Sequence, residues 1–131
     1  MRIVYMSVVG NTRQFVKKLG LPSFELDEST VYTEIKEPYV MIAPTYGIAI
    51  TELLNDFIET GDNISYCKGV IGGGNLNFNE LYCYTADDLS LDYGMPVLHR
   101  FEFTGSDKDV EKVLNICKEL DNKVQLATNN K

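Results

Sequence analysis

The spacing of hydrophobic residues changes several times along the chain, and each change marks a predicted element of secondary structure. Residues 2–6 (RIVYM) form an apolar run with the length of a buried strand. Apolar residues within 15–19 then recur at helical spacing, and the glycine and proline that follow are a common stop signal. The start of the chain therefore predicts a strand and a helix, joined by segment 7–12 (SVVGNT).

The same alternation continues along the rest of the chain. Thr51 is the expected N-cap of the second helix, and Gly61 follows its end. The segment 106–109 (SDKD) resembles a capping box at the start of the last helix, whose polar tail we expect to fray from about residue 125. The remaining predicted elements are strands at 23–26, 39–43, 66–71 and 97–103, and helices over 51–60, 82–93 and from 106 onward.

Five strands that alternate with four helices predict an α/β fold with a parallel sheet covered on both faces. Right-handed crossovers limit the possible topologies. A single domain over residues 1–131 suits a flavodoxin-like three-layer sandwich with the strand order 2-1-3-4-5. In such sheets ligands bind beyond the carboxyl ends of the strands, where the winding direction reverses. The loops after strands one, three and four are therefore the places to look for a site.

The charge balance narrows the expected partners. The chain has a net charge of −7, and Lys17-Lys18 is the only adjacent pair among its 12 Lys and Arg residues. We therefore expect no nucleic-acid partner, since phosphate neutralisation needs clustered basic residues. We also expect a cytoplasmic protein with no membrane partner, because we find neither a leader pattern nor an apolar run near the roughly 20 residues of a membrane span.

The cysteines and the single histidine give no sign of a metal site. The three cysteines contain no C-x-x-C pair, which excludes the usual patterns of a disulfide framework or a structural zinc site. Cys117 falls on the apolar stripe of the last helix and is expected to pack there, and Cys83 is interpreted as a spectator thiol. For His99 a structural hydrogen bond is favoured over a catalytic role.

Segment 7–12 is the first candidate loop. It joins a strand to the N-terminus of a helix, where unpaired N–H groups and the helix dipole favour an anion. Gly10 permits close approach of the backbone, and Ser7, Asn11 and Thr12 add short side-chain donors. These features are typical of a phosphate cradle without Lys or Arg, although an ordinary turn capped by Thr or Asn is an equal alternative.

Residues 44–47 (PTYG) form the second candidate loop. A tyrosine beside a glycine at the end of a strand can stack on a planar ligand, and the glycine can turn a peptide group toward the edge of a ring. The alternative is a turn whose tyrosine covers the sheet. The apolar segment 48–50 (IAI) that follows either folds back on the core or forms a docking surface.

Residues 72–79 (GGGNLNFN) form the third candidate loop. Backbone lying along a flat ring would justify the conformational entropy that three successive glycines lose on folding. Asn75 and Asn77 offer amide groups to a heterocycle, and Phe78 is either a second stacking group or a core residue. The alternative is a flexible loop before a capped helix. A phosphate end and a planar-ring end together favour flavin mononucleotide (FMN), since the G-x-G-x-x-G pattern of dinucleotide sites is absent after the first strand.

At these three loops the sequence resembles the NrdI family, the flavodoxin-like activators of class Ib ribonucleotide reductase. The resemblance covers nearly the whole chain and includes VGNTRQFVKKLGLP (9–22), PTYG (44–47) and the segment 69–113. Its most specific part is G-N-x-N-F followed by P-V-L-H-R-F-E-x-x-G-x-x-x-D-V. Two departures are Val9, where Ser or Thr is common, and Asn79, where Gly is common.

The resemblance implies roles for individual residues. Gly47 would lie near the reactive N5 atom of the flavin. The loop that would hold the phosphate consists of Ser7, Val8, Val9, Gly10, Asn11 and Thr12. The residues that would line the ring are Thr45, Tyr46 and Gly47 on one side and Gly73, Gly74, Asn75, Asn77 and Phe78 on the other.

The resemblance also implies an activity and partners. Proteins of this family are thought to take electrons from an upstream flavin reductant and to deliver superoxide to the dimanganese site of the radical-bearing small subunit, which generates its tyrosyl radical. The chain would then be a redox accessory flavoprotein, not a stand-alone enzyme. The alternatives are a general flavodoxin electron carrier and a flavin-free interaction module of the same fold.

Overall fold

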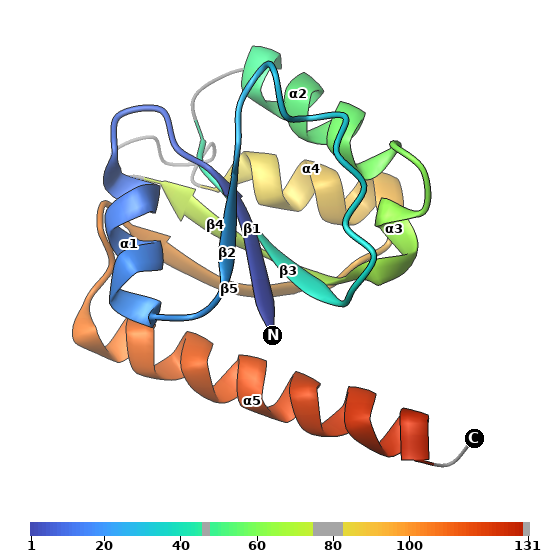
Figure 1. Cartoon of the computed structure of the whole chain (residues 1–131). Helices are drawn as coiled ribbons and strands as arrows, with labels where there is room; N and C mark the ends of the chain where they lie inside the picture. Colours follow the sequence, from blue (N-terminus) through green and yellow to red (C-terminus); the bar gives the residue numbers. More distant parts are fainter. Residues whose placement is uncertain (46–47, 75–82, 130–131) are drawn as a thin grey trace.

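Parallel strands form the centre of the fold, and helices cover both faces of the sheet (Figure 1). The computed structural model describes residues 1–45, 48–74 and 83–129. The strand order is β2-β1-β3-β4-β5, as predicted. The strands are β1 (Arg2–Met6), β2 (Ser23–Leu26), β3 (Tyr39–Ala43), β4 (Cys67–Gly74) and β5 (Val97–Glu102). The helices are α1 (Asn11–Leu19), α2 (Ile48–Ile58), α3 (Asn63–Tyr66), α4 (Tyr84–Tyr93) and α5 (Asp107–Asn129).

The sheet separates two hydrophobic cores. Successive residues of a strand point to opposite faces, so Ile3 and Tyr5 of β1 pack on one side, and Val4 and Met6 pack on the other. The first core lies against α1 and α5, and the second against α2 and α4 (Figure 1). All five residues of β3 are buried, which explains why the central strand reads as a continuous apolar run.

Helix α1 begins and ends at glycines in the left-handed region of backbone space. Gly10, the N-cap residue, has φ 94°, and Gly20, the C-cap residue, has φ 67°. Residues with a side chain rarely adopt these angles. The predicted end of this helix is therefore confirmed, while a Thr or Asn side-chain cap at its start is not, because the N-cap residue is Gly10, which has no side chain.

The capping box of α5 is confirmed. Ser106 Oγ accepts a hydrogen bond from the Asp109 N–H at 3.2 Å, and Asp109 Oδ2 accepts one from the Ser106 N–H at 2.8 Å. We expected the chain to fray from about residue 125. Residues 125–129 are instead helical, because α5 continues to Asn129. Just before this stretch, the partly buried Val124 lines a pocket together with Met1 and Arg2.

Three other element boundaries differ from the prediction. Helix α2 begins at Ile48, so Thr51 is an interior residue and not its N-cap, and the apolar segment 48–50 is the first turn of a helix. Strand β4 runs on through residues 72–74, which were expected to be loop. Tyr66 belongs to the short helix α3, which sequence periodicity did not reveal.

A buried asparagine joins α3 to the long connection between β2 and β3. The Asn63 amide donates to the carbonyl oxygens of Thr33 at 2.9 Å and Phe57 at 2.8 Å, and its own oxygen accepts the Ile35 N–H at 2.8 Å. The Tyr39 hydroxyl donates to the Asn63 carbonyl oxygen at 2.9 Å. Asn63 is only 1% exposed, so its side chain replaces water for three backbone groups.

Replacing Asn63 with Ala is expected to lower the free energy of unfolding by about 2–4 kcal/mol, because three main-chain groups lose their partner inside the protein. Urea denaturation followed by circular dichroism measures this loss. The matched control is Asn122→Ala on the exposed side of α5, which is expected to change stability by less than about 0.5 kcal/mol. A loss below about 1 kcal/mol for Asn63→Ala would contradict the role assigned to this network.

Candidate functional site

The carboxyl ends of three neighbouring strands form one edge of the sheet. Tyr5 of β1 lies opposite Ile42 of β3, which lies opposite Ile71 of β4. Because all three strands run in the same direction, the chain leaves them at the same edge (Figure 1). The segments that follow β1, β3 and β4 therefore start side by side, as the sequence predicted.

Ser7 organises the turn between β1 and α1. Its Oγ accepts hydrogen bonds from the N–H groups of Gly10 at 3.2 Å and Arg13 at 3.3 Å. A serine hydroxyl has two acceptor lone pairs and one O–H donor. Both acceptor positions are thus used within the loop, and the O–H remains available to donate to an acceptor outside it.

The start of α1 offers further donors. A helix leaves its first four N–H groups without partners inside the helix, and Ser7 takes two of them. Among the described residues, no acceptor is bonded to the N–H groups of Asn11 and Thr12. The helix dipole adds partial positive charge at this position. The loop is therefore suited to an anion that accepts several hydrogen bonds.

The two valines of this loop are exposed. Val8 is 46% exposed and Val9 is 64% exposed, so neither is held by the core. Val9 carries no hydroxyl where a Ser or Thr would supply one, but its main-chain N–H is unaffected by this change. Apart from the Gly10 N–H, which is bonded to Ser7, segment 7–12 can therefore offer main-chain N–H donors together with the Ser7 O–H.

A buried hydrogen bond ties the second candidate loop to the third. Thr45 is 4% exposed, and its hydroxyl donates to the carbonyl oxygen of Gly73 at 2.9 Å. This bond holds the end of β3 to the last residues of β4. The structure thus brings together segment 7–12, Thr45, Gly73 and Gly74 at one edge of the sheet.

Packing explains why two positions of β4 are occupied by glycine. A Cβ on Gly72 would lie 2.8 Å from the Cβ of Cys83, and a Cβ on Gly73 would lie 2.9 Å from Cζ of Phe101. Gly72 faces the core under α4, whereas Gly73 faces the core under α1 and α5. Because neither core leaves room for a side chain, the run of glycines is not by itself evidence for a flat ligand.

Five of the predicted site residues lie outside the described part of the chain. They are Tyr46, Gly47, Asn75, Asn77 and Phe78. The roles assigned to them therefore stay predictions.

Comparison with known proteins identifies the family. Residues 3–115 match the sequence model of the family described as NrdI flavodoxin-like. The chain belongs to this family. It is 38% identical over 125 residues to the protein NrdI of Rhodococcus opacus strain B4, which covers 86% of this chain and 82% of that protein. It is also 38% identical over 120 residues to the protein NrdI of Brucella ovis, covering 86% of this chain and 89% of that protein.

Solved structures support the fold of this NrdI-family chain. The structure of oxidised flavodoxin 2 from Bacillus cereus matches with a TM-score of 0.69 at 19% identity, covering 93% of this chain and 97% of that chain. A short-chain flavodoxin associated with a bacterial microcompartment matches with a TM-score of 0.61 at 17% identity, covering 93% and 96% of the two chains. At such low identity the likeness shows the flavodoxin fold alone, which confirms the predicted fold class.

His99 has the structural hydrogen bond expected for it. Its Nε2 lies 2.7 Å from Asp109 Oδ1, so the bond joins β5 to the first turn of α5. Burial alone would raise the pKa of Asp109, but hydrogen bonds from Ser106 and His99 outweigh that effect and hold it below its usual value. His99 therefore stabilises the capping box of α5.

The described cysteines occupy different environments, and none is disulfide-bonded. Cys117 is buried in the core under α1 and α5, as predicted, and burial raises the pKa of its thiol to about 11. Cys83 is buried beside Gly72 at the N-cap of α4. A protonated, buried thiol is a poor nucleophile, so Cys117 serves packing.

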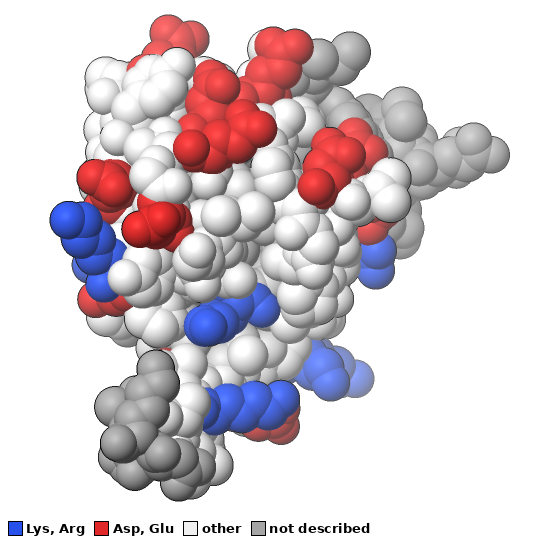
Figure 2. Space-filling model, turned by 90° about the vertical axis from the view of Figure 1, so that its right-hand side faces the viewer, with Lys and Arg blue, Asp and Glu red and all other residues white. Residues whose placement is uncertain are grey.

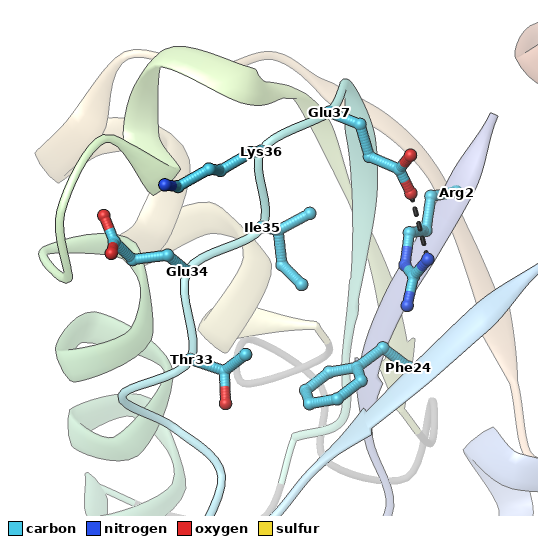
Figure 3. Close-up of a pocket in the computed structure, with 7 residues that line it drawn as sticks. All are labelled: Arg2, Phe24, Thr33, Glu34, Ile35, Lys36 and Glu37. Atoms are coloured by element: carbon cyan, nitrogen blue, oxygen red, sulfur yellow. Dashed lines mark hydrogen bonds and ion pairs between the residues drawn. The ribbon is translucent and has the colours of Figure 1, made fainter.

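A pocket at the opposite end of the sheet has a different lining. It encloses about 320 Å³ between the start of β1, strand β2 and segment 33–37 (Figure 3). Arg2 is paired there with Glu37 at 3.0 Å, and Phe24 and Ile35 provide an apolar wall. None of the predicted site residues lines this pocket, and its paired charges do not favour an anion.

Acidic side chains are concentrated on part of the surface. Figure 2 shows Asp and Glu side chains gathered over the upper part of one face, with Lys and Arg side chains below them.

Burial and the nearby Glu59 raise the pKa of Tyr93 to about 12, and Asp92 and Asp56 add to this effect. The neighbouring carboxylates therefore favour the protonated phenol of Tyr93, because a phenolate would be repelled by their negative charge.

Neither a metal-binding cluster nor a membrane-spanning helix occurs among the described residues. Within 1–45, 48–74 and 83–129, no group of three or more His, Cys, Asp and Glu side chains has an arrangement that would bind a metal ion. Over the same ranges, every helix is too short or too polar to cross a bilayer.

Replacing Gly73 with Ala is expected to destabilise the protein by about 1–3 kcal/mol, because the new methyl group would overlap the ring of Phe101. The same change made in a Phe101→Leu background is expected to cost less, since leucine lacks the distal ring atoms. Thermal unfolding of the four proteins in this cycle measures the coupling. Equal costs in both backgrounds would show that the glycine is not required by this contact.

Proposed function

We propose that the chain binds FMN at the carboxyl edge of its sheet and acts as an NrdI-type redox protein. In this role it supplies reduced oxygen or electrons for assembly of the dimanganese–tyrosyl radical cofactor in the small subunit of class Ib ribonucleotide reductase. The observation that carries the proposal is the donor-rich turn organised by Ser7, in a chain of the NrdI flavodoxin-like family. An upstream flavin reductant and a cytoplasmic setting belong to the same proposal.

The donor set fits the phosphate end of FMN. A phosphate group is an acceptor with several oxygens, and it needs converging N–H and O–H donors. The Ser7 hydroxyl and the N–H groups of Asn11 and Thr12 lie on one short turn with no competing described acceptor. In this proposal Ser7, Val8, Val9, Gly10, Asn11 and Thr12 hold the phosphate.

The ends of β3 and β4 would orient the ring. Thr45 and Gly73 are joined by a buried hydrogen bond, so the ends of β3 and β4 are already connected without a ligand. Gly74 stands at the end of β4, and its carbonyl oxygen accepts the N–H of Phe103 at 3.1 Å. Thr45, Gly73 and Gly74 would line the ring together with Tyr46, Gly47, Asn75, Asn77 and Phe78, with Gly47 beside N5.

The protein's own part in this function is to bind and orient. FMN, when bound, supplies the electron transfer that amino-acid side chains cannot perform. The chain's residues fix its phosphate through neutral donors and limit the movement of its ring. Docking against the small subunit would then use the carboxyl edge of the sheet, where the flavin would be held.

Ser7→Ala is expected to weaken FMN binding by about 10- to 100-fold, because one hydrogen bond to a charged group and the order of the turn are both lost. Riboflavin lacks the phosphate, so its affinity is expected to change little. Quenching of flavin fluorescence during titration of the apoprotein measures both affinities. The matched control, Ser65→Ala, changes an exposed serine just before β4 at the other end of the sheet. Equal losses for FMN and riboflavin would contradict the phosphate role of this loop.

The reduced FMN-loaded protein, mixed with oxygen and the manganese-loaded small subunit, is expected to generate a tyrosyl radical. Electron paramagnetic resonance detects this radical. The control omits the protein and keeps reduced free FMN. A protein that binds FMN but yields no radical above this control would be a general electron carrier. A colourless protein that takes up no FMN would instead be an interaction module.

A further inference from the structure

Arg13 is the only Lys or Arg between residues 3 and 16, and it stands in the first turn of α1. Its guanidinium donates hydrogen bonds to both oxygens of the Glu25 carboxylate. Arg13 Nε donates to Glu25 Oε1 at 2.7 Å, and a terminal guanidinium nitrogen donates to Glu25 Oε2 at 3.1 Å. Such paired bonds fix the plane of the guanidinium as well as its position.

The position of Glu25 directs this cation away from the ring end of the candidate site. Glu25 lies on β2, opposite Tyr5 of β1. Because β1 stands between β2 and β3, the guanidinium of Arg13 is held on the side of β1 that faces away from β3 and β4. The main chain of the same residue remains in the turn, since its N–H donates to Ser7 Oγ at 3.3 Å.

Without Glu25, the Arg13 side chain would be free to move toward segment 7–12. Side chains in a helix lean toward its N-terminus, which here is segment 7–12. Arg13 is 46% exposed, so the core does not hold it in its present position. A phosphate bound at the start of α1 would then be the strongest acceptor in reach of the released guanidinium.

We propose that Glu25 is a positioning residue that keeps the Arg13 guanidinium out of the phosphate cradle, so that the phosphate of FMN is held by neutral donors alone. This inference rests on the proposed function. The hydrogen bonds of Arg13 also lower the pKa of Glu25, so the carboxylate stays charged at neutral pH. It therefore keeps its two hydrogen bonds to Arg13, which together form the Arg13–Glu25 clamp. The negative charge of a bound phosphate would then not be paired with a side-chain cation.

The test compares the affinities of FMN and riboflavin at low and high ionic strength for the wild type and five variants of the full chain. Glu25→Ala opens the clamp, and Glu25→Gln serves as a second opening variant should Glu25→Ala fold poorly. Arg13→Gln removes the cation, and Glu25→Ala/Arg13→Gln removes both groups. Glu37→Ala is the matched control, because it also removes one carboxylate from an exposed Arg pair but frees Arg2 at the other end of the sheet.

Glu25→Ala is expected to raise the affinity for FMN by about fivefold at roughly 10 mM salt, where screening is weak, and to lose this gain near 1 M salt. Riboflavin affinity is expected to stay the same. Arg13→Gln, the double variant and Glu37→Ala are expected to keep the wild-type ratio of FMN to riboflavin affinity at both salt concentrations.

Two results would overturn the inference while leaving the proposed function intact. In the first, wild type binds FMN but neither Glu25 variant raises the ratio of FMN to riboflavin affinity. In the second, Arg13→Gln itself weakens FMN binding in a salt-dependent way, which would mean that Arg13 already contacts the phosphate. If the wild-type protein takes up no FMN at all, the proposed function is wrong and this inference falls with it.

Discussion

Parallel pairing is the constraint on which the rest of the structure depends. A strand that is to lie parallel to its neighbour must start at the same end of the sheet, so each connection has to cross the whole layer. Here the crossing segments carry α1, α2 and α4, and α5 follows the last strand; the apolar sides of these helices fill both cores. Because the strands are parallel, the loops that follow them all begin at the same edge of the sheet. The candidate site is thus a consequence of topology before any side chain is considered.

The fold was predictable where a periodic pattern was long and ended at strong stop signals. The limits of β1, β2 and β3 agree with the prediction. β1 and β3 are mainly apolar runs, whereas β2 (SFEL) is bounded by Pro22 and by the polar segment that begins at Asp27. The extension of β4 was missed because glycine contributes no hydrophobic signal, although backbone pairing continues through it. Helix α3 is too short to show a period. The early start of α2 was missed because its first turn is apolar throughout and shows no alternation.

The candidate site was predictable to a lesser extent. The composition of segment 7–12 indicated an anion cradle, but it did not show that the Ser7 hydroxyl oxygen accepts two hydrogen bonds within the turn. The bond from Thr45 to Gly73 joins residues far apart in the sequence and depends on strand order. The same holds for the clamp between Arg13 and Glu25, which requires α1 to lie over the edge strand. Contacts of this kind are set by tertiary structure, and a single sequence carries no local pattern for them.

The sheet keeps the two cores chemically separate. No buried side chain among the described residues belongs to both of them, since neighbouring strand positions point to opposite faces. Energetic effects of substitutions at distant, unconnected sites add with little coupling. Changes beneath α2 and α4 can therefore accumulate over evolution without a compensating change beneath α1 and α5. The layer between them acts as a partition, so that repacking on one face of the sheet does not require repacking on the other.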